Sequence, residues 1–455
     1  MKKSKWFIPV AALVILSMIL IGCTAKAATE TTPATTTEAT SAETETTQAE
    51  ETAPAEEVTL KIMHNWGPED SKGPAILSIF NDFMKAYPNI KIETEILPDI
   101  DIDSKVEVAF QASEEPDIVM QYIGGTNQDW LGDGVTIDVT SLLKEWGLEG
   151  IFSDQALKDW TDKDGHLLGF PLEGYAVFNA AYNKKILDAA GVTDIPKTTN
   201  DLIAAAEKIK AAGFETFATG GNDWSGFNLA TSIITAGVGQ DLANQLIGQG
   251  RWADNPEAVE AVKLFTSLRD AGVFVSNVEG LDYASANELF YSGKAAILAL
   301  ATWQFGEVPQ DMVSDVVMDG FPLPASSPYD KTVVNMGFGG KSLRITRNGA
   351  EKLNAVETLT KFFFQPEMIA RLVEGGMISP LKETPIDESK LNSLLVEALK
   401  ANADKFTIIS YFDAIMPSKA AADITQTWDA AFIPGTTAEQ IITDLDSIIS
   451  SALEQ

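Results

Sequence analysis

Apolar and polar positions alternate where the ordered pattern of the chain begins. Val58, Leu60 and Ile62 follow the two-residue period of a half-buried strand. After Pro74, apolar residues recur at helical spacing until Tyr87-Pro88, and a second strand pattern then starts at Ile90; the helical positions are Ile76, Ile79, Phe80, Phe83 and Met84. This order predicts a right-handed βαβ unit, and therefore an α/β fold with a largely parallel sheet covered by helices.

A third predicted strand, the apolar residues 118–120, ends in the polar and glycine-rich segment 121–125. Ligands of open α/β sheets bind beyond the carboxyl ends of the strands. The pairs Asn65-Trp66 and Gln121-Tyr122 each follow a predicted strand, so both lie where a binding site is expected.

The N-terminus has the layout of a secretion signal. Lys2, Lys3 and Lys5 precede the apolar residues 6–21, and Leu20-Ile21-Gly22-Cys23 resembles a bacterial lipobox. That resemblance implies a signal peptide over 1–22 and acylation of Cys23. A membrane-spanning anchor is less favoured because the apolar stretch is at the short end of the roughly 17–25 residues that span a bilayer. Cys23 is the only cysteine, so no disulfide is expected.

Residues 23–57 predict a disordered acidic tether after the lipidated cysteine. This segment consists mainly of Thr, Ala, Glu, Pro and Ser and holds no aromatic residue, so it cannot bury enough apolar surface to offset its ordering entropy. The whole chain has a net charge of −32, which argues against binding to nucleic acid. The remaining residues, 58–455, are too many for one ordinary core and predict two lobes.

The most specific pattern lies in the middle of the chain. Thr198 and Asp201 have the spacing of a capping box, and apolar residues at helical spacing follow until Gly213. Further motifs are the segments 168–173 (LGFPLE), 180–185 (AAYNKK), 190–192 (AGV), 196–202 (PKTTNDL), 288–297 (ELFYSGKAAI), 335–340 (NMGFGG) and 428–432 (WDAAF). As a set, these segments resemble the extracellular solute-binding proteins of carbohydrate ABC importers, the maltose-binding-protein-like family.

The resemblance implies a two-lobed periplasmic-binding-protein-like fold with a ligand cleft and a multi-strand hinge. Lobe one is expected to hold residues 58–171 and 318–346, and lobe two residues 172–317 and 347–455. The chain is expected to cross between lobes near Pro171, between Gly320 and Pro324, and between Thr346 and Glu351.

A sugar presents flat C–H faces and a rim of hydroxyls, so its site needs aromatic rings and hydrogen-bonding side chains. Trp224 and Trp303 stand beside glycines or at a strand end and favour a site, Trp66 and Trp428 fit either site or core, and Trp130, Trp146, Trp160 and Trp252 are assigned to packing. Gln121 and Tyr175 match sugar-contacting positions of the family. The candidate ligand-binding residues are Trp66, Gln121, Tyr122, Glu173, Tyr175, Asn222, Asp223, Trp224, Trp303, Asn335 and Trp428.

The resemblance also implies a role. The protein is expected to be a monomer, lipid-anchored on the extracytoplasmic face of the cell membrane, that passes a carbohydrate to separate permease subunits without a cofactor or metal. A glycoside hydrolase or an adhesin stays as the alternative. A metal carrier is disfavoured because His64 and His166 are the only histidines and lie far apart in the sequence.

Overall fold

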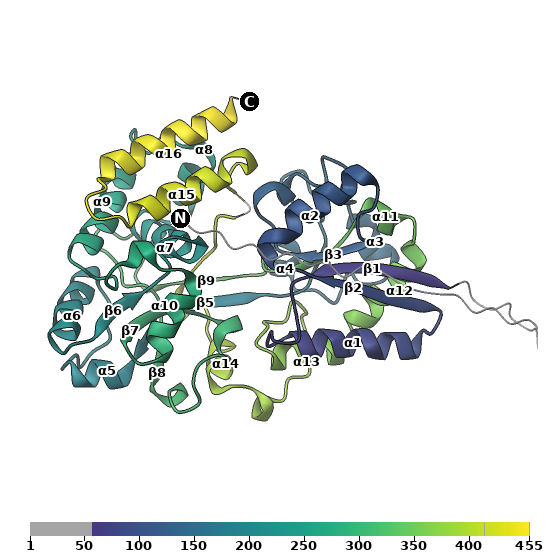
Figure 1. The fold of residues 1–455 in the computed structure, drawn as a ribbon, viewed down its shortest axis with the longest axis horizontal. Coiled ribbons are helices and arrows are strands. Elements are labelled where there is room, and N and C mark those ends of the chain that lie inside the picture. The colour runs from purple at the N-terminus through teal and green to yellow at the C-terminus, as the bar shows by residue number, and fades with distance from the viewer. Residues whose placement is uncertain (1–56, 414, 455) are drawn as a thin grey trace, which may run out of the picture. The chain divides into compact units, whose positions relative to one another are not determined.

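The computed structural model describes residues 57–413 and 415–454, which form two β-sheets and the helices around them (Figure 1). The predicted signal peptide, Cys23 and the predicted tether up to residue 56 lie outside the described residues. Among the helices that are described, none is long and apolar enough to cross a membrane.

The first sheet has the strand order β2-β1-β3-β10-β4. Strand β1 pairs in parallel with β2 over the register Val58↔Ile90 to His64↔Ile96, and also in parallel with β3. Helix α1 connects β1 to β2, so the predicted βαβ unit is confirmed. The strands are β1 (Val58–His64), β2 (Ile90–Ile96), β3 (Ile118–Gln121), β4 (Phe170–Pro171) and β10 (Ser342–Ile345).

Helix α1 (Gly73–Ala86) has the features from which it was predicted in the sequence. A proline stands in its first turn, and Ile76, Ile79 and Phe83 are buried at helical spacing against the sheet. The first sheet and the helices that pack on it are here called the first half of the molecule, and the second sheet with its helices the second half. The other helices of the first half are α2 (Asp99–Ala112), α3 (Thr140–Glu145), α4 (Asp154–Asp159), α11 (Arg347–Ala350), α12 (Leu353–Phe363) and α13 (Pro366–Glu374).

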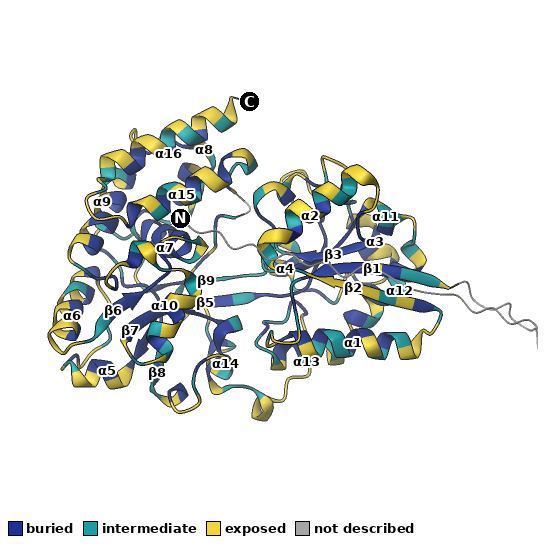
Figure 2. Cartoon of the chain, in the orientation of Figure 1, coloured by how far each residue is buried: buried dark blue, intermediate teal, exposed yellow. Residues whose placement is uncertain are grey.

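The second sheet has the order β11-β9-β5-β7-β6, with β8 also paired to β5. Its central strand β5 is buried along almost its whole length. The strands are β5 (Tyr175–Asn183), β6 (Glu215–Ala218), β7 (Ala295–Ala301), β8 (Val316–Asp319), β9 (Val333–Gly337) and β11 (Thr407–Ile409). Figure 2 shows the strands largely buried and the outward faces of the helices exposed.

The helices of this second half include the predicted one, α6, which begins with the Thr198–Asp201 capping box and is therefore confirmed. They are α5 (Lys184–Ala189), α6 (Thr199–Ala211), α7 (Trp224–Val238), α8 (Gln240–Gln249), α9 (Pro256–Asp270), α10 (Tyr283–Tyr291), α14 (Ser393–Ala398), α15 (Ala421–Ala431) and α16 (Ala438–Leu453).

The connections between the sheets differ from the sequence analysis at two of three places. The first crossing, from β4 to β5, lies beside Pro171 as predicted. The second lies between β9 and β10, not at 320–324. The third lies between Leu381, which bridges to Phe152 of the first half, and Asn392, whose side chain donates to Phe305 O of the second half.

The predicted lobe boundaries are therefore corrected. Strands β8 and β9, within 318–346, pair with β5 in the second sheet, although this segment was assigned to lobe one. Helices α12 and α13, within 347–455, pack against α1 and β1, although they were assigned to lobe two. The predicted lobe assignment rests on a resemblance between short segments, whereas the sheet that a segment joins is decided by contacts between residues far apart in the chain.

Candidate functional site

Five aromatic side chains form a contiguous surface at the end of the second sheet where β7 and β11 end and β5 begins. This surface is here called the aromatic platform, and its residues are Tyr175, Trp224, Tyr283, Trp303 and Tyr411. The Trp224 ring lies 4.8 Å from Tyr283 and 6.5 Å from Trp303, centroid to centroid. Tyr175 meets Trp303 edge-on at 6.3 Å and stacks on Tyr411 at 5.4 Å. The Trp303 indole N–H donates to the Tyr283 hydroxyl at 3.0 Å, which fixes both rings.

Helix starts and strand ends hold these rings in place. Tyr175 opens β5 and Trp303 follows the end of β7, while Trp224 and Tyr283 are the first residues of α7 and α10. The Asp223 carboxylate joins the two helix starts, because it accepts from the backbone N–H of Ser225 at 2.9 Å and of Tyr283 at 2.5 Å. Asp223 is thus a positioning residue for the platform.

The platform is accessible, unlike the protein core. Trp224 is 44% exposed, whereas the other four platform residues are half-buried. Large aromatic rings that are kept partly in solvent and held by hydrogen bonds are available to stack on a ligand.

The first sheet contributes a polar surface. Asn65 Nδ2 donates to Asp99 Oδ2 at 3.0 Å, and Asp99 also forms an ion pair with Lys341. The Lys341 ammonium lies 5.9 Å from the centre of the Tyr122 ring. Asn65, Asp99 and Tyr122 are half-buried, so this surface is partly open to solvent, although Asn65 Oδ1 itself is buried.

Asp413 links the two surfaces. Its backbone carbonyl accepts from Gln128 Nε2 of the first half at 3.0 Å, and Gly124 lies so close that a Cβ there would be 3.1 Å from Asp413 Cβ. Burial, together with the charge of Asp413 among others, raises the pKa of both Tyr122 and Tyr175. The platform and the polar surface therefore lie on two sides of the same carboxyl group, whose own pKa is raised to about 6 by burial.

Four of the predicted ligand-binding residues belong instead to the interior. Trp428 is fully buried, with edge-on contacts to Trp252 and Phe265. Trp66 is 1% exposed, and the ammonium of Lys341 lies 5.2 Å from its ring centre. The side chains of Gln121 and Asn335 are buried as well, and each is used in internal hydrogen bonds: Gln121 donates to Asp99 O and Asp103 Oδ1, and Asn335 accepts from Asn179 and Ser232.

The remaining predicted residues have three different environments. Glu173 forms a buried ion pair with Lys72 at 2.7 Å beside the first crossing, so its carboxylate is already used. Asn222 is exposed on the loop before α7. Five predicted residues lie at or beside the candidate site: Tyr122, Tyr175, Asp223, Trp224 and Trp303. The four tryptophans that were assigned to packing are all buried.

Sequence reasoning missed Tyr283, Tyr411, Asp99, Lys341 and Asp413. Tyr283 had a usable signal, since Asp282-Tyr283 starts a helix in the way that Asp223-Trp224 does. Tyr411 and Asp413 follow a strand of only three residues, and Lys341 lies in a crossing that was predicted elsewhere.

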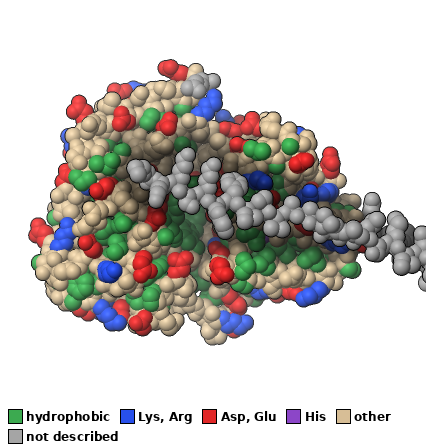
Figure 3. All heavy atoms as spheres, viewed as in Figure 1, with side chains coloured by type: hydrophobic (Ala, Val, Ile, Leu, Met, Phe, Trp, Pro, Cys, Tyr) green, Lys and Arg blue, Asp and Glu red, His purple; other side chains and the backbone are tan. Residues whose placement is uncertain are grey.

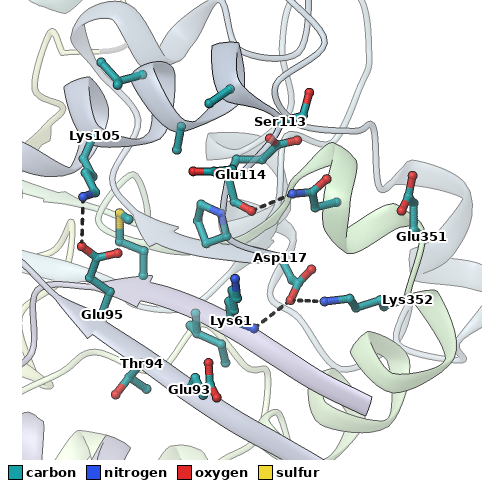
Figure 4. A pocket seen from close by; sticks show the side chains of 18 residues that line it. Lys61, Glu93, Thr94, Glu95, Lys105, Ser113, Glu114, Asp117, Glu351 and Lys352 are labelled. Atoms are coloured by element: carbon teal, nitrogen blue, oxygen red, sulfur yellow. Dashed lines mark hydrogen bonds and ion pairs between the residues drawn. The ribbon is translucent and has the colours of Figure 1, made fainter. Parts of the chain in front are cut away.

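A groove of about 900 Å³ lies at the opposite end of β3 from Tyr122 (Figure 4). Its lining includes Asp117, which pairs with Lys352 at 2.8 Å and accepts from the Lys61 backbone N–H. No aromatic ring is among its lining residues, so this groove lacks the stacking surface that the platform has.

The described residues contain no group of three His, Cys, Asp or Glu side chains that could hold a metal ion. Burial, and secondarily the charge of Lys341, lowers the pKa of His64 to about 4, so this histidine is neutral at physiological pH. Acidic side chains are spread over the face seen in Figure 3 with fewer basic ones between them, in keeping with the acidic composition.

Comparison with known proteins agrees with this architecture. Residues 66–368 match the family described as bacterial extracellular solute-binding protein. The maltotriose-binding protein of Pyrococcus abyssi is 24% identical over 74% of this chain and 69% of its own length.

Two solved structures share the fold. A probable secreted solute-binding lipoprotein from Streptomyces coelicolor is 30% identical, with a TM-score of 0.74 over 86% of this chain and 98% of the other. A chitin oligosaccharide binding protein is 23% identical, with a TM-score of 0.75 over 88% of this chain and all of the other (100%).

Proposed function

The chain belongs to the bacterial extracellular solute-binding protein family, and on that premise we propose that it captures a sugar or oligosaccharide between its lobes and delivers it to the permease of an ABC importer. The names of two similar proteins, which bind maltotriose and chitin oligosaccharides, support a carbohydrate as the ligand.

The aromatic platform is the observation that carries this proposal. A pyranose ring has C–H faces that stack on indole and phenol rings, and hydroxyls that pair with amides and carboxylates. Trp224, with 44% of its surface exposed, offers the stacking face. Asn65 and Asp99 of the first half, together with Asp413, offer the polar partners.

Binding by lobe closure follows from the connections. Three crossings join the two sheets, and Gly174 in the first of them is closely packed, since a Cβ there would be 2.7 Å from the Phe338 ring. A ligand that contacts both lobes stabilises the closed arrangement, and a permease that contacts both lobes can distinguish closed from open.

The proposed location is the outer surface of the cell membrane, with Cys23 as the lipid attachment point. The family is extracellular, and the lipobox-like sequence before Cys23 supports the anchor. No catalytic step is proposed, because the similar proteins are named as binding proteins.

A thermal-shift panel of maltotriose, N,N′-diacetylchitobiose, xylotriose and raffinose tests this proposal. A sugar at about one hundred times its Kd stabilises the native state by roughly 2.7 kcal/mol, which is a readily measured shift in Tm. At least one member is expected to shift Tm and to bind in calorimetry. A protein whose Tm responds to no sugar in the panel would contradict the proposal.

A further inference from the structure

A small cavity lies beneath the aromatic platform. Trp224, Tyr283, Trp303 and Tyr411 contribute to its lining from the platform, and Asn179 and Asn228 contribute to it from β5 and α7. Its volume is about 30 Å³. Typical ligand pockets measure about 300–1,000 Å³, and one water needs about 10–15 Å³, so this cavity can take a single substituent of a ligand rather than a ring.

The chemistry of the lining restricts what enters. Among the described residues that line the cavity, none carries a charge, and several are amides or hydroxyls. A charged group would be desolvated there without a counter-ion, which costs far more than burying a neutral hydroxyl. The lining therefore fits a neutral, hydrogen-bonding substituent.

Most polar groups of the lining already have partners inside the protein. Ser225 Oγ donates to Asp223 at 2.6 Å, Gln304 Oε1 accepts from the Ala301 N–H at 2.8 Å, and Asn179 Nδ2 donates to Asn335 at 2.7 Å. Asn228 differs from the other described lining residues, because it is 9% exposed and its Oδ1 is buried without any hydrogen-bond partner. A buried amide oxygen left unpaired costs about 1–3 kcal/mol, so it requires a donor from outside the protein.

We propose that this cavity is a subsite for one hydroxyl-bearing substituent of the sugar, and that Asn228 Oδ1 accepts the hydrogen bond of that hydroxyl. This inference rests on the proposed function and adds a residue that sets specificity. A sugar whose ring stacks on Trp224 and Trp303 directs one substituent below the rings, where the Asn228 amide selects ligands that carry a hydroxyl at that position.

Variants of Asn228 test the subsite. Asn228→Leu keeps the approximate shape and removes the acceptor, and Asn228→Ala removes it while leaving room for the ligand. Thr231→Val is the matched control, because Thr231 is buried on the same helix, does not line the cavity, and donates only to the backbone carbonyls of Phe227 and Asn228, so the Asn228 side chain is left unchanged. Calorimetry uses whichever of the four panel sugars binds the unmodified protein most tightly, and chemical denaturation without sugar reports folding.

We expect both Asn228 variants to weaken sugar binding by about 5- to 150-fold, the range given by the cost of an unpaired acceptor, with no loss of stability of the free protein. Thr231→Val should bind as the unmodified protein does. If the unmodified protein binds a sugar and both Asn228 variants bind it equally well, the cavity holds water only and the subsite is wrong while the proposed function stands. If the unmodified protein binds none of the four sugars, the proposed function fails, and the subsite fails with it.

Discussion

Some tryptophans of this protein are buried in the core and others are partly exposed, as Trp428 and Trp303 show. Trp428 is enclosed between Trp252 and Phe265 in the second half, whereas Trp303 is half-buried at the end of a strand and hydrogen-bonded to Tyr283. In the sequence, Trp303 follows the apolar strand β7, whereas Trp428 follows the mostly polar residues 423–427 of α15. The first contributes to folding, and the second is assigned to ligand stacking.

Trp303→Ala should therefore reduce sugar affinity more than stability. Loss of one stacking face removes about 0.5–1.5 kcal/mol beyond the area buried, and truncation of a half-exposed ring should cost less than the 3–5 kcal/mol that is typical of a core tryptophan. Calorimetry with the panel sugar and denaturation of the free variant measure the two effects. Trp428→Ala is the control and should lose about 3–5 kcal/mol of stability. A stable Trp303→Ala protein with unchanged affinity would remove Trp303 from the site.

Asp413 should make stability depend on pH in a defined direction. Its pKa rises from 3.8 to about 6 on folding because of burial, so the native state binds its proton more tightly. The stability that Asp413 contributes is therefore present at pH 4 and is lost as the pH rises to about 6. His64, whose pKa falls to about 4, acts in the opposite direction over this range, whereas Asp429, whose pKa rises to about 6 mainly through burial, acts in the same direction as Asp413.

The comparison of the unmodified protein with Asp413→Asn isolates the Asp413 contribution, since the other groups are common to both. The difference in unfolding free energy, unmodified minus variant, should decrease from pH 4 to pH 6 in denaturant titrations. Asp444→Asn, on the exposed face of α16, serves as the control. A difference that stays constant over this range would show that folding does not raise the pKa of Asp413.

At the scale of elements, the first crossing depends on a buried ion pair. Lys72 stands at the start of α1 and Glu173 lies between β4 and β5, and their side chains are 7% and 11% exposed. Glu173→Met leaves the Lys72 ammonium buried and unpaired, which is expected to cost about 3–5 kcal/mol of stability. Replacing both residues by Met should restore most of the loss, because a well-packed apolar pair is often as stable as a buried ion pair.

Urea denaturation of the unmodified protein, Lys72→Met, Glu173→Met and the double variant gives a double-mutant cycle for this ion pair. The structure predicts a large coupling energy between positions 72 and 173. If Glu173→Met lowered sugar affinity with little loss of stability, Glu173 would be a ligand-binding residue, as the sequence alone suggested.

The sequence predicted individual elements well and their assembly less well. The pattern from Val58 to Ile92 gave β1, α1 and β2, and the Thr198–Asp201 box gave the start of α6, because capping and periodicity are local properties. Which sheet receives β9 or α12 depends on contacts between residues far apart in the chain. The same limit applies to the candidate site: Trp224 and Trp303 stay predictions made from their loops, whereas the burial of Gln121 and Asn335 was missed because their internal partners are distant in sequence.

At the scale of the whole molecule, membrane attachment is assigned to one residue outside the described part of the chain. Cys23→Ala should release the protein from the membrane fraction while sugar binding by the released protein is unchanged, because the site lies in residues 65–413. Fractionation of washed membranes, with Ser41→Ala in the acidic segment as control, measures this. Retention of Cys23→Ala at the level of the unmodified protein would exclude lipid anchoring at Cys23.

Capture of a sugar by closure of two lobes is the central claim, and small-angle X-ray scattering tests it most directly. The radius of gyration is measured for the free protein and at a saturating concentration of the panel sugar, with saturation established by calorimetry on the same sample. The account predicts a smaller radius of gyration with sugar, because contacts to both the platform and the first-sheet residues favour the closed form. An identical scattering curve with sugar bound would contradict capture by closure.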